Sequence, residues 1–116
     1  MKIRRVAKLC LTSALSCVCF AQTPARAAPF SITTTVSMVE ATYMPKFITF
    51  NVTSPAGACG AGALLYWQAQ GADEPSQIAN TQAIFALLLT AETSGKSISI
   101  WGDDSNCTVN CIHILS

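Results

Sequence analysis

The hydrophobic positions in the first third of this chain alternate with polar ones, which is the period of a β-strand. In residues 30–42 most large apolar side chains fall on one parity and most threonines and serines fall on the other, and residues 47–52 repeat the alternation. We therefore expect two strands, joined as a hairpin across a break at residues 44–46. The side chains expected to face one way are Ile32, Val36 and Met38 in the first strand and Ile48, Phe50 and Val52 in the second.

The period changes from two to 3.6 in the middle of the chain. Residues 53–62 are rich in glycine and form a predicted loop, and residues 63–68 form a third strand. That strand has apolar side chains on both parities, so we expect both of its faces to be covered. A helix is then predicted over residues 77–94. Its signals are an apolar stripe at Ile84, Leu87, Leu88 and Ala91, a cap at Asp73 or Ser76, Pro75 in the first turn and a stop at Gly95.

Two more strands complete the predicted order. Residues 97–101 alternate with Ile98 and Ile100 on one face, residues 102–106 form a turn, and residues 107–115 form the last strand. Three strands, one helix and two strands indicate a single α+β domain that is mainly β. This is the element order of an OB-fold, a small five-stranded barrel with one helix between strands 3 and 4.

The charges divide the chain into two parts. Five of the seven basic residues lie in residues 1–27, no acidic residue precedes Glu40, and residues 9–20 form an apolar run. This layout predicts a secretory signal peptide over residues 1–27, cleaved after Ala27, or alternatively after Ala21. We therefore expect a secreted or periplasmic domain over residues 28–116. A lipoprotein signal with Cys17 as the lipid-carrying residue is the rival interpretation.

The domain that remains has two lysines and six acidic residues, a formal charge of −4. It therefore lacks the basic surface that nucleic acid requires, and we expect no nucleic-acid partner. With the apolar run removed, we also expect no membrane span.

Three cysteines remain after processing: Cys59, Cys107 and Cys111. In an oxidising compartment we expect one disulfide, with Cys59 and Cys107 favoured because both adjoin turn-rich segments, and with Cys111 as the alternative partner. The third thiol, Cys111, would then be buried and inert in the last strand. The spacing from Cys107 to Cys111 is not that of a redox CxxC motif, and His113 adds no paired zinc-ligand spacing. We expect no metal site, no cofactor and no catalytic residue, hence no enzyme.

The stretch SQIANTQAIFALLLTAETSGKSISIWGDDSNCTVNCIHILS, residues 76–116, resembles the corresponding part of the B subunits of AB5-type bacterial toxins, the cholera- and pertussis-like group. In both, a long helix leads into a strand that ends in an aromatic residue, followed by a polar turn and an apolar strand. The resemblance implies an OB-fold subunit that forms a ring and binds cell-surface glycans. It assigns Trp101 to the aromatic residue that stacks on a sugar.

The turn after Trp101 would supply hydrogen bonds to the hydroxyl groups of the sugar. Its candidate side chains are Asp103, Asp104 and Asn106. An indole face packs on the C–H surface of a sugar while acidic side chains accept its O–H groups. Ordinary turn chemistry is the alternative for these three side chains. We therefore expect an exported glycan-binding module that forms a homo-oligomer, and the alternative is an inhibitor or adaptor that binds a protein partner.

Overall fold

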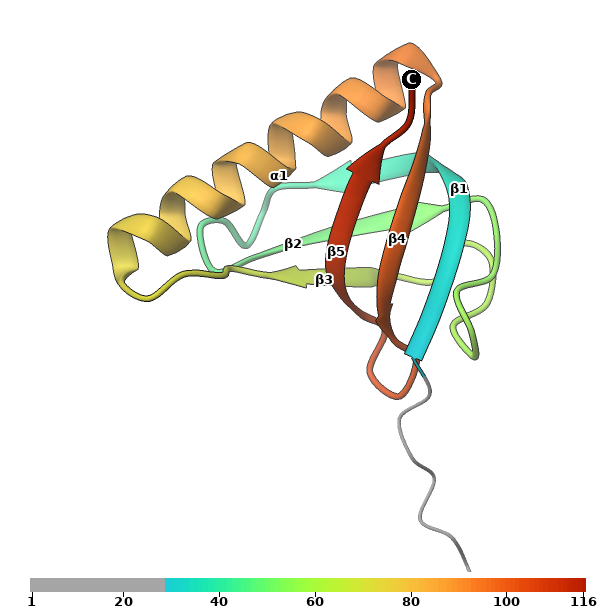
Figure 1. Cartoon of the computed structure of the whole chain (residues 1–116), viewed down its shortest axis with the longest axis horizontal. Helices are drawn as coiled ribbons and strands as arrows, with labels where there is room; N and C mark the ends of the chain where they lie inside the picture. The colour runs from blue at the N-terminus through green and yellow to red at the C-terminus, as the bar shows by residue number, and fades with distance from the viewer. Residues whose placement is uncertain (1–28) are drawn as a thin grey trace, which may run out of the picture.

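The computed structural model describes residues 29–116 of the chain. Five strands and one helix follow in the predicted order (Figure 1). The elements are β1 (Pro29–Glu40), β2 (Phe47–Val52), β3 (Leu65–Gln68), α1 (Glu74–Ser94), β4 (Ser97–Asp103) and β5 (Thr108–Ile114). The prediction of a mainly β fold with one helix between the third and fourth strands is thus confirmed. The predicted signal peptide, Cys17 and both cleavage positions lie outside the described residues.

The five strands form one closed ring in the order β1-β2-β3-β5-β4, with β4 paired back to β1. Neighbouring strands run antiparallel except β3 and β5, which run parallel over two residue pairs, Tyr66–Thr108 and Trp67–Val109. The predicted hairpin of β1 and β2 is confirmed. Seven consecutive pairs join β1 to β4, from Pro29–Asp103 to Thr35–Ser97.

Inward-facing side chains of all five strands fill the ring. The predicted inward faces of β2 and β4 are confirmed, because Ile48, Phe50, Ile98 and Ile100 are fully buried. In β1 a register shift follows Val36, which is buried, so Met38 is only half-buried. The other large core side chains are Phe30, Val52, Leu65, Trp67, Leu88, Val109 and Ile112.

The third strand differs from its prediction. It begins at Leu65 instead of residue 63, and only Leu65 and Trp67 face the core. Tyr66 points to the outer face and is half-buried near Phe47, whose ring centroid is 6.3 Å away. Leu64 is exposed. The expectation that both faces are covered is met only in part, because the outward Tyr66 is half-buried and Leu64 is exposed.

The helix begins three residues before the predicted start, at Glu74, and ends as predicted. The Asp73 side chain is the N-cap and accepts a hydrogen bond from the Ser76 backbone N–H at 2.9 Å, while Gly95 caps the C-terminus in the left-handed conformation. Leu88 and Ala91 are buried against the sheet, as the stripe predicted. The first turns of α1 extend past the strands (Figure 1). Within residues 29–116 there is no helix with the length and apolar character to cross a membrane.

Candidate functional site

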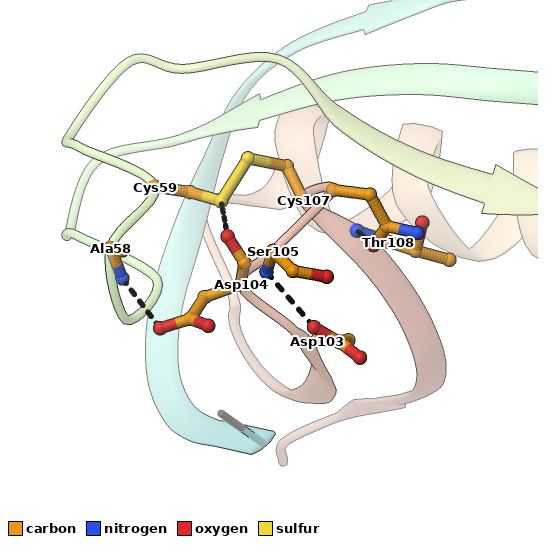
Figure 2. Close-up of a disulfide and its surroundings, with 8 residues drawn as sticks. Ala58, Cys59, Asp103, Asp104, Ser105, Cys107 and Thr108 are labelled. Atoms are coloured by element: carbon orange, nitrogen blue, oxygen red, sulfur yellow. Dashed lines mark hydrogen bonds between the residues drawn. A yellow bond between two sulfur atoms is a disulfide. The ribbon is translucent and has the colours of Figure 1, made fainter. Parts of the chain in front are cut away.

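A disulfide fixes one end of the sheet. Cys59 and Cys107 are bonded, with their Cα atoms 5.9 Å apart, and Cys111 is free, so the favoured pairing is confirmed. The bond joins the loop between β2 and β3 to the turn between β4 and β5 (Figure 2). Two segments 48 residues apart in sequence are therefore held together beside the predicted sugar-binding turn.

The polar side chains of that turn accept hydrogen bonds from the backbone. Asp103 Oδ1 accepts from the Ser105 N–H at 2.9 Å and Asn106 Oδ1 accepts from the Thr108 N–H at 3.2 Å. Asp104 Oδ2 accepts from the Ala58 N–H at 2.9 Å, across the disulfide-linked loop (Figure 2). All three candidate ligands thus contribute to holding the turn and its neighbouring loop. Within residues 29–116 no group of three or more metal-ligating side chains converges on one point.

The Asp104 carboxylate also explains why a glycine stands at position 57. A Cβ atom at Gly57 would lie 2.6 Å from Asp104 Oδ2, and Gly57 has a positive φ of 59°. The loop backbone therefore approaches the carboxylate more closely than any other residue type would permit. Asp104 is accordingly a structural link between the loop and the turn.

Trp101 lies on the outer face of β4 and is 46% exposed. The sheet register places it between Ser31 of β1 and Cys111 of β5. The next outward row along β4 places Ser99 between Thr33 and His113. We call these six side chains the outer patch: Ser31, Thr33, Ser99, Trp101, Cys111 and His113.

The outer patch contains no carboxylate, lysine or arginine. Its indole is bordered by hydroxyl groups, a thiol and an imidazole, and directly opposite residues of neighbouring strands have Cβ atoms about 5 Å apart. The Trp101 and His113 rings meet edge to face, with centroids 5.3 Å apart. The patch thus presents one large aromatic surface among small polar groups.

The structure brings Trp101 next to side chains that sequence reasoning did not group with it. The predicted partners in the turn lie beyond Trp101 at the end of β4, whereas the cross-strand neighbours are Ser31 and Cys111. Strand alternation indicated which residues of β1 share one face. It could not indicate which of them pairs with Trp101. The register between β1 and β4 joins residues that are far apart in the sequence, and no local pattern determines it.

Cys111 is half-exposed, so the expectation of a buried thiol was wrong. A register shift between β4 and β5 pairs Gly102 with Val109 but Trp101 with Cys111, which leaves one extra residue in β5. Such a bulge reverses the facing of the residues that follow it. Val109 therefore points inward and Cys111 outward, although both have the same parity. The Cys111 Sγ lies 3.7 Å from His113 Nε2.

A cleft lies away from the outer patch. It is a cleft of about 520 Å³ between the β1–β2 connection, the end of β3 and the start of α1. Phe47 and Ile78 contribute apolar surface, and Lys46 and Glu74 contribute charge. The remaining lining residues are Pro45, Gln68, Ala69 and Gln77. Sequence analysis did not find this cleft, because its lining comes from three separate segments without a shared motif.

Comparison with family models, with curated proteins and with solved structures finds no match to this chain.

Proposed function

We propose that this protein is an exported, non-enzymatic module that binds carbohydrate through the outer patch. The observation that carries the proposal is Trp101, a large aromatic side chain exposed in the middle of a sheet face that is otherwise small and polar. Exposure leaves the indole able to stack on the C–H face of a sugar ring. The hydroxyl groups of Ser31, Thr33 and Ser99 can each donate and accept hydrogen bonds with sugar hydroxyls.

The charge distribution favours an uncharged sugar. The outer patch has no cation that would pair with a carboxylate or sulfate group, and residues 28–116 carry a formal charge of −4. An anionic glycan would be repelled by the domain as a whole. We therefore expect neutral hexose-containing glycans to bind in preference to sialylated or sulfated ones.

The strand arrangement supports an OB-like barrel, which is the fold that the resemblance to toxin B subunits implies. A ring in the order β1-β2-β3-β5-β4, with a parallel β3–β5 pair and a helix between β3 and β4, is the connectivity expected of an OB-like barrel. In this proposal the domain is such a barrel and assembles with copies of itself. Assembly would present several weak sugar sites together and raise the avidity.

The test is a glycan array followed by titration of the best ligand with the variants Trp101→Leu and Tyr43→Leu. Tyr43 is 49% exposed and lies outside the outer patch, so it is a matched control for the loss of an exposed aromatic side chain. We expect Trp101→Leu to weaken binding about tenfold or more, equivalent to about 1.4 kcal/mol. Tyr43→Leu should bind as the wild type does.

Two outcomes would count against the sugar. Binding that Trp101→Leu leaves unchanged would exclude the outer patch as the site. An array with no ligand, combined with a monomer in solution, would favour the alternative of an inhibitor or adaptor that binds a protein partner.

A further inference from the structure

The outer patch brings a thiol and an imidazole together. Cys111 Sγ and His113 Nε2 are 3.7 Å apart on the outward face of β5, and both side chains are accessible from solvent. Cys111 is the only free cysteine among the described residues, because Cys59 and Cys107 are bonded to each other. The indole of Trp101 stands on the same face, paired in register with Cys111 and in edge contact with the His113 ring.

We propose that Cys111 and His113 form a binding site for a soft monovalent metal ion of the copper group, Cu(I), for which Ag(I) is a redox-inert probe. A thiolate sulfur is the ligand that such ions prefer, and imidazole nitrogen also suits copper. The proposal goes beyond sugar binding and does not depend on it.

The spacing of the two ligand atoms fits a metal ion between them. Bonds of about 2.3 Å to sulfur and about 2.0 Å to imidazole nitrogen, the lengths typical of zinc, span the 3.7 Å separation at an angle of about 119°. That angle leaves a third position open toward solvent for a small exogenous ligand. Two protein ligands are too few for a closed zinc site, which takes four, and sulfur is a poor ligand for calcium. The donor set therefore selects a soft ion of low coordination number.

The sheet holds the two ligands in place. Cys111 and His113 are two residues apart on one strand, so they share a face, and each is paired with a residue of β4. The bulge precedes both residues and turns their shared face outward. Trp101 adds an aromatic face beside the site, where a bound cation would gain a cation–π interaction.

The experiment is a titration of the protein, as recovered from an exporting host, with Ag(I) and then anaerobically with Cu(I) against a chromophoric chelator. We expect one equivalent to bind and to change the emission of Trp101, the exposed tryptophan of the two in the chain; Trp67 is buried. Cys111→Ser should abolish this binding, and His113→Ala should weaken it about tenfold or more. Trp101→Leu should weaken it only about two- to fivefold.

The N-terminal segment, if it is retained, adds three further thiols that could bind metal: Cys10, Cys17 and Cys19. The wild type and Cys111→Ser share these thiols, so the difference in binding between the two proteins reports on Cys111 alone. Circular dichroism of each variant checks that the fold is intact. Equal affinity of His113→Ala and the wild type would overturn the proposal, since a lone thiol would then explain the binding. Binding that survives in Cys111→Ser would overturn it as well. Sugar titrations run in the presence of a metal chelator keep the two proposals separate.

Discussion

Hydrogen bonds lower the pKa of two carboxyl groups in the domain. At Glu40 the main cause is the Thr49 hydroxyl, which donates at 2.7 Å, and the Thr42 hydroxyl adds to it. At Asp73 the side chain of Ser76 lowers the pKa most, followed by the Ser76 backbone N–H. A carboxyl group whose pKa is lower in the folded state stabilises the fold above its unfolded pKa. That stabilisation is lost as the pH falls through the lowered folded value.

The N-cap of α1 stabilises the first turn of the helix. Asp73→Ala should lower the urea concentration at the unfolding midpoint at pH 7, because the first turn of α1 loses its side-chain acceptor. Asp73→Asn keeps a side-chain acceptor, so the stability of the domain at pH 7 should fall much less. This variant should also lack the loss of stability below about pH 4 that protonation of the Asp73 carboxylate causes. Urea unfolding at pH 7 and pH 3 measures both effects. An Asp73→Ala variant as stable as the wild type would show that the cap contributes nothing.

The disulfide is the feature that acts between elements. In the chain-entropy account, a bond that closes a loop of 48 residues stabilises the folded state by about 4 kcal/mol. We expect the Cys59→Ser/Cys107→Ser double variant to unfold at a correspondingly lower urea concentration. Reductant should lower the midpoint of the wild type and leave that of the double variant unchanged. If the two proteins unfold alike under oxidising conditions, the bond does not stabilise the fold.

Local signals predicted most of the elements, and long-range pairing set the rest. Asp73, Pro75 and Gly95 marked the helix within a few residues, because capping depends only on the residues beside it. The bulge in β5 and the short β3 depend on which strand lies alongside, so nothing local marked them. The outward position of Cys111 was missed for that reason, although alternation alone places Cys111 and His113 on one face of the strand. The same holds for the outer patch, where alternation gave the faces of single strands but not the neighbours of Trp101.

At the scale of the whole molecule, the exposed side of α1 gives a test of assembly. Residues 75–91 contain no charged side chain, and Leu89 is 41% exposed although Leu88 beside it is fully buried. If copies of the chain pack through this side of the helix, Leu89→Arg should dissociate the oligomer without unfolding the domain. Thr93→Arg is the control. It introduces the same charge one turn later, at the exposed end of the helix and outside its uncharged part. Light scattering measures the mass, and a wild-type monomer would refute assembly.

The pairing of β4 with both β1 and β5 also determines how the domain would respond to mechanical force. Pro29 begins β1 beside Asp103, at one end of β4, whereas Ile114 ends β5 beside Ile98, near the other. Tension applied between these two points shears both ladders lengthwise, so many hydrogen bonds carry the load together instead of opening one by one. After the strand pairs have separated, the Cys59–Cys107 bond still prevents the 48 residues between the two cysteines from extending. The fully stretched chain is therefore about 160 Å shorter than it would be without the bond. The domain is therefore a shear-resistant link of limited extensibility.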